Sequence, residues 1–210
     1  MLGILFMGLL VMGINGSAEA AEAINLPPPQ ISGGMPLMQA LQARQSTREF
    51  SSRTLPPQML SDLLWAAQGV NRPATGKRTA PSAHDWREID VYVTRADGVF
   101  VYEPDAHLLR KVLDRDVRAL TGRQDFPAAA PLNLVYVADT RRMVDADAEQ
   151  KAFYSAADTG FIAQNVYLFC ASAGLGAVVR GAVDRDALAI ALGLGPHQRI
   201  ILSQTVGYPK

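Results

Sequence analysis

The chain has 210 residues, of which 49% are hydrophobic and 19% are charged. This length and composition suit one globular domain with a sizeable core, and they exclude a disordered chain. Twenty basic and twenty acidic residues cancel, so no net charge attracts nucleic acid or an anionic membrane surface. We therefore expect a protein that binds no nucleic acid.

The N-terminal residues predict an export signal. MLGILFMGLLVMGI, residues 1–14, is an unbroken apolar run that is short for a membrane span and suits a signal-peptide core. Two A-x-A cleavage patterns follow, at 18–20 and at 21–23. We predict a signal peptide over 1–23, a proline-rich linker over 24–35 and one domain over 36–210. The protein is then exported, to the periplasm, and has no membrane segment after processing. Because no Lys or Arg precedes the run, an uncleaved anchor is the alternative.

The first half of the domain contains clear element signals. A short helix is expected over 36–43 and a second over 57–68, whose leucines repeat on one face and which Gly69 ends. Residues 88–95 and 99–104 flank the pair Asp97-Gly98, which predicts a β-hairpin. Residues 106–120 place Leu109, Val112, Leu113 and Val117 at helical spacing and predict an amphipathic helix.

The second half begins with a buried strand over 132–139. A long helix over 156–173 is apolar on more than one face, which predicts burial on several sides or at a subunit interface. It contains Cys170, which is the one cysteine, so an intramolecular disulfide is excluded and a buried, inert thiol is expected. A strand from Ala177, a helix capped by Asp184 and a strand over 199–206 complete the domain. This mixture predicts an α+β fold with a mixed sheet wrapped by helices.

Several familiar site types are absent from the sequence. There is no G-x-S-x-G, so a nucleophile elbow is not expected. His84, His107 and His197 are dispersed and lack a metal-ligand spacing. No G-x-G-x-x-G follows a strand. We therefore predict no metal site and no catalytic side chain of these classes.

A basic cluster is the strongest candidate site. The stretch RQSTREF, residues 44–50, places Arg44, Ser46 and Arg48 at alternate positions. Guanidinium groups match phosphate geometry in a bidentate way, and a serine hydroxyl adds a donor. In an extended segment all three side chains would face one side, toward one anion. The alternative is an ordinary solvated, charged surface.

RQSTREF resembles the R-x-S-x-[RK]-x-F opening of the FMN-dependent nitroreductase superfamily. RTAPSAHDWREIDVYV, TGFIAQNVYLFCASAGLG with AVVRGAV, and the terminal VGYPK resemble three further segments of that superfamily, in the same order. The likeness is strongest to its short branch, related to the SagB and ThcOx azoline oxidases. It implies a nitroreductase-like fold with a mixed, mainly antiparallel sheet, and an obligate homodimer with a flavin at each subunit interface.

The resemblance also implies site residues, with FMN as the cofactor. Arg44, Ser46 and Arg48 would hold the FMN phosphate, and Lys210 would add a positive charge nearby. Pro81, Ser82 and Ala83 would line the isoalloxazine from the neighbouring subunit. Backbone groups around Arg180 and Gly181 would face the flavin edge. His84 and Asp85 replace the small polar residues of many relatives, so they are expected to affect substrate choice rather than flavin binding.

The chemistry implied is that of a ping-pong oxidoreductase. Two electrons would pass from NAD(P)H or another donor through flavin N5 to a small organic acceptor, without a protein general base. A second reading is a flavin-dependent dehydrogenase of the azoline-oxidase type. A third is a non-catalytic flavin-binding protein, and a fourth is a colourless exported domain. Flavin content and turnover distinguish among them.

Overall fold

The computed structural model describes residues 22–210, so the predicted signal peptide over 1–23 lies almost wholly outside the described residues. Its centre is a seven-stranded sheet in the order β1-β6-β5-β4-β7-β9-β8, in which every neighbouring pair is antiparallel. The strands are β1 (Ala23–Asn25), β4 (Ile89–Arg95), β5 (Gly98–Glu103), β6 (Leu108–Leu113), β7 (Leu132–Asp139), β8 (Gly176–Arg180) and β9 (Gln198–Gly207). The short strands β2 (Val70–Arg72) and β3 (Lys77–Arg78) form a separate ribbon. The predicted α+β class with a mainly antiparallel sheet is confirmed.

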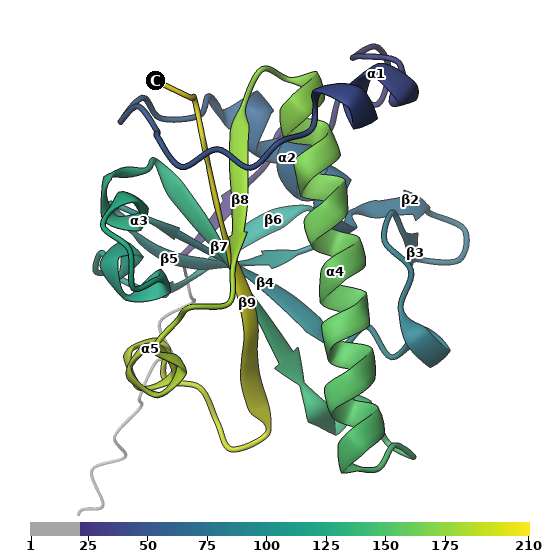
Figure 1. Ribbon diagram of the computed structural model, residues 1–210. Helices are drawn as coiled ribbons and strands as arrows, with labels where there is room; N and C mark the ends of the chain where they lie inside the picture. The colour runs from purple at the N-terminus through teal and green to yellow at the C-terminus, as the bar shows by residue number, and fades with distance from the viewer. Residues whose placement is uncertain (1–21) are drawn as a thin grey trace, which may run out of the picture.

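Helices cover both faces of the sheet (Figure 1). One face packs against α2 (Pro57–Gln68) and α4 (Ala148–Ser172), and the other packs against α5 (Arg185–Leu192). The remaining helices are α1 (Leu37–Ala43), α3 (Phe126–Ala129) and the 3₁₀ helices η1 (Ala83–Asp85), η2 (Arg118–Thr121) and η3 (Thr140–Arg142). In β7 every residue is buried, as expected of a central strand covered on both faces. Within residues 22–210 no helix combines the length and apolarity that crossing a membrane requires.

Helix α4 begins eight residues earlier than the sequence predicts. Asp147 accepts a hydrogen bond from the backbone N–H of Gln150, and the Gln150 side chain accepts one from the Asp147 N–H, which makes a capping box. The first turn after this box, AEQK, is mostly polar, and Phe153 in the second turn is 66% exposed, so this stretch has no apolar stripe that would predict a helix. The helix buries one face against the sheet, and its sole cysteine, Cys170, is buried there as expected. Burial raises the pKa of the Cys170 thiol, which keeps it protonated and unreactive.

The prediction of an amphipathic helix over 106–120 is wrong. Residues 108–113 instead form β6, which pairs with β5 on one side and β1 on the other, and η2 follows. The apolar residues that fit a helical period also fit this arrangement, with Leu109 fully buried. Long-range strand pairing overrides a weak local preference here.

The predicted hairpin is confirmed, and Gly98 lies at its turn with φ +136°. Leu113 O lies 2.4 Å from where a Cβ of residue 98 would sit, so a larger residue would clash there.

Part of the predicted linker over 24–35 packs against the domain. Residues 22–27 form this packed segment, called the strap. Strand β1 pairs with β6, and Lys111 N donates to the Glu22 carbonyl at 2.8 Å. Beyond β1, the Ser61 hydroxyl donates to the Pro27 carbonyl at 2.6 Å and lies 2.7 Å from His107 Nε2. The Tyr102 hydroxyl lies 2.9 Å from the other ring nitrogen of His107. His107 therefore ties the strap to the sheet and to α2.

Substituting His107 with Gln should reduce the loss in free energy of unfolding that occurs as the pH falls. Burial lowers the pKa of His107 below its ordinary value of 6.5. The unfolded chain then binds more protons just below pH 6.5, so the contribution of neutral His107 is complete above that pH and is lost as the pH falls through its folded pKa. Urea unfolding from pH 5 to pH 8 measures this difference. An identical pH dependence in wild type and His107→Gln would contradict it.

Candidate functional site

The RQSTREF segment runs along the outer edge of β8, which is the last strand of the sheet. Ser46 forms a parallel bridge with Ala177, and Thr47 N donates to the Ala177 carbonyl at 3.0 Å. A Cβ at Gly176 would lie 2.9 Å from Thr47 Cβ, so a glycine is required for this close approach. The segment is therefore extended, as expected, and the sheet edge holds it in place.

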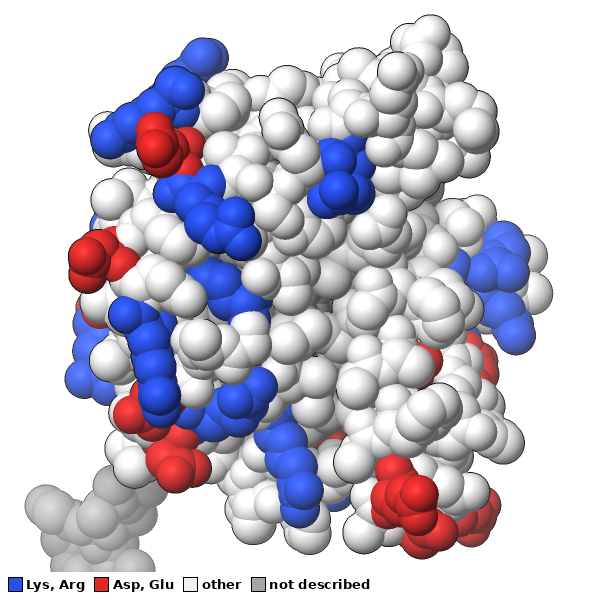
Figure 2. All heavy atoms as spheres, in the orientation of Figure 1, with Lys and Arg blue, Asp and Glu red and all other residues white. Residues whose placement is uncertain are grey.

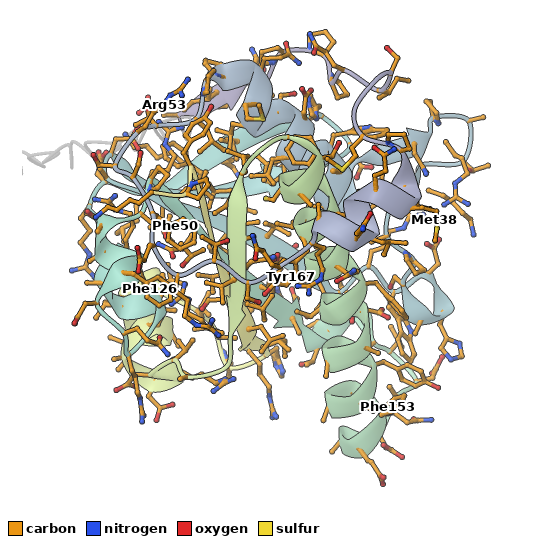
Figure 3. All side chains as sticks on the ribbon, turned by 45° about the horizontal axis from the view of Figure 1, so that its top comes forward. Met38, Phe50, Arg53, Phe126, Phe153 and Tyr167 are labelled. Atoms are coloured by element: carbon orange, nitrogen blue, oxygen red, sulfur yellow. The ribbon has the colours of Figure 1, made fainter. Side chains whose placement is uncertain are left out.

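Tyr167 of α4 organises the start of this segment. Its hydroxyl oxygen accepts a hydrogen bond from Val179 N at 2.8 Å and lies 3.0 Å from Ser46 Oγ. The Arg44 guanidinium lies 5.4 Å from the centre of the Tyr167 ring. Figure 3 shows Tyr167 between α4 and β8, beneath the coil that follows α1. Arg44 and Ser46 thus share one side of the segment. The alternation predicts Arg48 on that side as well, and this part stays a prediction. Sequence reasoning missed Tyr167, whose one signal is a hydroxyl in an otherwise apolar stretch of helix.

The C-terminus lies beside the same segment. Ser51 N donates to the Tyr208 carbonyl at 2.9 Å, and Lys210 N donates to the Glu49 carbonyl at 3.2 Å. Phe50, only 4% exposed, anchors this crossing (Figure 3). The structure therefore brings the predicted residue Lys210 next to the basic segment.

The two guanidinium groups of the segment have no carboxylate partner in the part of the chain that the structure describes. Among residues 22–210, no ion pair involves Arg44 or Arg48, and neither side chain makes a hydrogen bond to a described residue. Seven arginines elsewhere form ion pairs, for example Arg87 with Asp85 at 2.8 Å, while others, such as the exposed Arg123 and Arg199, form none within residues 22–210. Figure 2 shows basic side chains gathered over the side of the molecule where β8 and the C-terminus lie. Two unpaired guanidiniums and an exposed hydroxyl suit a phosphate dianion, so the donor set fits the predicted cofactor.

The second predicted segment, 81–83, contacts a different part of α4, at Asp158. Ala83 N donates to Asp158 Oδ2 at 2.9 Å, and Arg87 N donates to Ser82 Oγ at 2.8 Å. Asp158 and Tyr167 are nine residues apart, which corresponds to about 13.5 Å along the helix. The structure therefore does not bring Pro81, Ser82 and Ala83 together with the basic segment within one chain.

His84 and Asp85 form a strained turn after this segment. Their φ angles are +50° and +56°, and Arg87 has φ +50°. A bidentate pair between Arg87 and Asp85, at 2.9 and 2.8 Å, holds the turn. This hydrogen bonding lowers the pKa of the Asp85 carboxyl. The His84 ring stacks on Trp86 with centroids 4.5 Å apart. Left-handed conformations at non-glycine residues persist only where the surroundings fix them.

Arg180 is a buried residue whose side chain is used within the protein. It is 5% exposed and donates to Thr121 O at 2.6 Å and to Asn133 Oδ1 at 2.8 Å. Its guanidinium also lies 5.6 Å from the centre of the Phe126 ring. Burial lowers the pKa of Arg180 to about 10, which leaves it charged at neutral pH. Gly181, which follows, is exposed. The prediction for this pair concerned backbone groups, and it stays a prediction.

No alternative metal chemistry is evident in the part of the chain that the structure describes. No group of three or more His, Cys, Asp or Glu side chains there could hold a metal ion.

Replacing Tyr167 with Phe should weaken the anchoring of the segment. The change leaves Val179 N without its acceptor, and a buried unpaired donor costs about 1–3 kcal/mol in free energy of unfolding. It also frees the Ser46 hydroxyl from its position. Urea unfolding measures the loss, and Tyr154→Phe, for which no hydrogen bond of the hydroxyl is found in the described residues, is the matched control. Equal stability of both variants would contradict the assignment.

Comparisons with known proteins place the chain in a family. The model of the nitroreductase family matches residues 41–208. A candidate nitroreductase of Methanocaldococcus jannaschii is 36% identical over 149 residues, which are 66% of this chain and 75% of that protein. The crystal structure of a candidate nitroreductase from Ralstonia eutropha JMP134 is 47% identical, covers 97% of this chain and 96% of its own, and superposes with a TM-score of 0.86. An NADPH:FMN oxidoreductase from Vibrio harveyi, solved with NAD⁺, shares the fold alone, at 19% identity and a TM-score of 0.63 over 83% of this chain and 69% of its own. The chain belongs to the nitroreductase family.

Proposed function

We propose that the protein is an FMN-dependent oxidoreductase that transfers two electrons from a reduced donor to a small organic acceptor. The observation that carries the proposal is the pair of guanidiniums, Arg44 and Arg48, that have no ion-pair partner within residues 22–210 and lie on one extended segment with the Ser46 hydroxyl. Family membership supports the oxidoreductase class, and the donor set supports a phosphate-bearing cofactor.

The chain's own residues would position the cofactor. Arg44 and Arg48 would donate to the phosphate, Ser46 would add its hydroxyl, and Lys210 would contribute a further positive charge. Tyr167 would keep Arg44 and Ser46 on one side, because its ring and hydroxyl contact both. Bound FMN would supply the redox chemistry, while the protein sets its position and electrostatic surroundings.

We further propose that a second copy of the chain completes the site. Large apolar side chains are exposed on α1, where Met38 is 75% exposed, and on the outer side of α4, where Phe153 and Phe161 are 66% and 48% exposed. Figure 3 shows Met38 and Phe153 on the same outer side of the molecule. Such a surface suits burial between subunits. Pairing through it would allow segment 81–83 of one copy to approach the basic segment of the other.

Export is also part of the proposal, and it rests on the apolar N-terminal run. Cleavage after Ala20 would keep the contacts of Glu22 with Lys111, whereas cleavage after Ala23 would remove them and shorten β1. N-terminal sequencing of the secreted protein distinguishes these products. A protein that retains Met1 would contradict processing.

Turnover tests the enzymatic part of the proposal. NADH or NADPH, or another two-electron donor, should bleach the flavin band of the anaerobic protein, and a nitroaromatic or quinone acceptor should restore it. A flavin that only dithionite bleaches, and that no organic acceptor reoxidises, would instead assign a binding role.

Sedimentation of Phe161→Glu against wild type tests the dimer, since a charge placed on the outer side of α4 should favour the monomer.

A further inference from the structure

A cavity of about 220 Å³ lies where α4, the start of β4 and the β2–β3 ribbon meet. Its apolar lining comes from four residues that share small or branched side chains: Ala80, Pro81, Ile89 and Ile162. Its polar lining includes Arg78, Ser82, Glu88 and Asp158. This space is larger than a single buried water requires.

Glu88 contributes a buried oxygen that has no partner. The residue is 0% exposed, and its Oε2 accepts a hydrogen bond from Ser82 Oγ at 3.3 Å. Its Oε1 has no hydrogen-bond partner among the described residues. An unsatisfied buried polar atom is costly, so such an atom at a cavity points to a missing ligand or water.

Arg78 contributes a buried donor to the same cavity. Its Nε has no acceptor among residues 22–210, and its side chain is only 14% exposed. Its ion pair, with Asp105 at 3.6 Å, uses another nitrogen and a carboxylate that is 70% exposed. Only four buried side-chain polar atoms lack partners in the described chain, and two of them belong to residues that line this one cavity.

The surroundings of Glu88 favour its neutral form. Burial raises the pKa of Glu88, and the Asp158 carboxylate, itself 2% exposed, raises it further. The other charged groups that line the cavity are Arg72 from β2, Lys77 and Arg78 from β3, and Asp85 and Arg87 from the turn. A protonated Glu88 carries a hydroxyl donor, as carboxylic acids kept neutral in apolar sites do. The cavity then offers the Arg78 guanidinium and, in competition with its hydrogen bond to Asp158, the Glu88 hydroxyl as donors above an apolar floor.

We propose that this cavity binds the carboxylate of a small aliphatic acid, with one oxygen accepting from Arg78 Nε and the other from the protonated Glu88 carboxyl group. The isoleucine, alanine and proline side chains would contact its hydrocarbon body. The cavity shares Pro81 and Ser82 with the segment proposed to line the isoalloxazine, whereas Arg78 and Glu88 are not contacts of the proposed flavin site. Pentanoate binding and flavin content are therefore measured separately, and the failure of one is distinguishable from the failure of the other.

A methyl NMR titration of the purified protein with pentanoate tests the proposal directly. The δ-methyl signals of Ile89 and Ile162 should shift together and saturate, while that of Ile190, exposed on α5, should not move. 1-Pentanol, which has the same chain without the carboxylate, should bind at least roughly tenfold more weakly, because it loses the charge-assisted hydrogen bonds.

Two variants separate the roles of the donors. Arg78→Met should weaken pentanoate binding at least roughly tenfold, and thermal unfolding confirms that the variant is folded. Glu88→Gln keeps a donor but cannot ionise, so it should bind at every pH. In the wild type the apparent Kd should rise about tenfold per pH unit above the pKa of Glu88. Glu103→Gln, at a half-exposed carboxyl on β5, should leave the pH dependence unchanged.

Three outcomes would overturn the proposal. One is the absence of shifts at Ile89 and Ile162 from pH 5 to pH 8, which would leave water as the sole occupant. A second is saturating shifts that neither Arg78→Met nor Glu88→Gln changes, which would indicate pentanoate bound adventitiously. The third is equal affinity for 1-pentanol.

Discussion

The double variant Arg44→Ala/Arg48→Ala should purify without flavin, while its free energy of unfolding should stay close to that of the wild type. Each guanidinium would make charge-assisted hydrogen bonds to the phosphate, worth about 1.5–3 kcal/mol each. Together they would lower FMN affinity by at least about 100-fold. The fold should persist, since neither side chain has an ion-pair or hydrogen-bond partner among the described residues.

Flavin content per chain, read from the visible absorption and from FMN released on denaturation, measures this effect. Arg123→Ala/Arg199→Ala is a matched control, because both arginines are exposed and neither has an ion pair within residues 22–210. The control should retain its flavin. Full flavin content in the Arg44→Ala/Arg48→Ala variant would contradict the phosphate assignment.

The second large effect is expected at Arg180, on stability rather than on flavin. Arg180→Ala removes a large side chain that is only 5% exposed and leaves a cavity beside Phe126, at a cost of about 3–5 kcal/mol in free energy of unfolding. Arg180→Met should cost less, about 1–2 kcal/mol, because it preserves most of the volume. Thr121 O and Asn133 Oδ1 each keep another donor, Ser203 and Thr205.

Urea unfolding of the two Arg180 variants measures these costs. Folded Arg180→Met should still bind FMN, because the side chain points to η2 and α3 and not to the basic segment. Loss of FMN without loss of stability would instead show that the guanidinium itself contacts the cofactor.

Local signals were enough to predict most of the fold. The helix over 57–68, the hairpin around Asp97-Gly98 and the strand over 132–139 match α2, β4–β5 and β7 closely. These elements have strong periodicity or a defined turn. The leucines and valines of residues 106–120 satisfy a helical period and predict a helix, although pairing with β5 and β1 decides the conformation of this stretch. Such pairing involves partners distant in the sequence.

The candidate site was predictable to a similar extent. The alternation in RQSTREF predicts an extended segment with Arg44, Ser46 and Arg48 on one side. The structure has the segment extended, with Arg44 and Ser46 both against Tyr167, and the position of the Arg48 side chain stays a prediction. The role of Tyr167 could not be predicted, because its contact with Ser46, which is 121 positions away in the sequence, depends on how α4 packs on β8. The buried position of the Arg180 side chain likewise follows from packing. The assignment to the short branch and the flavin contacts of Pro81, Ser82, Ala83 and Gly181 stay predictions.

The visible absorption spectrum of the purified protein tests the central claim most directly. The account predicts the bands of oxidised flavin, a ratio near one flavin per chain, and FMN as the species released on denaturation. A colourless protein that also takes up no added FMN would contradict it, and the unpaired guanidiniums of Arg44 and Arg48 would then be an ordinary charged surface.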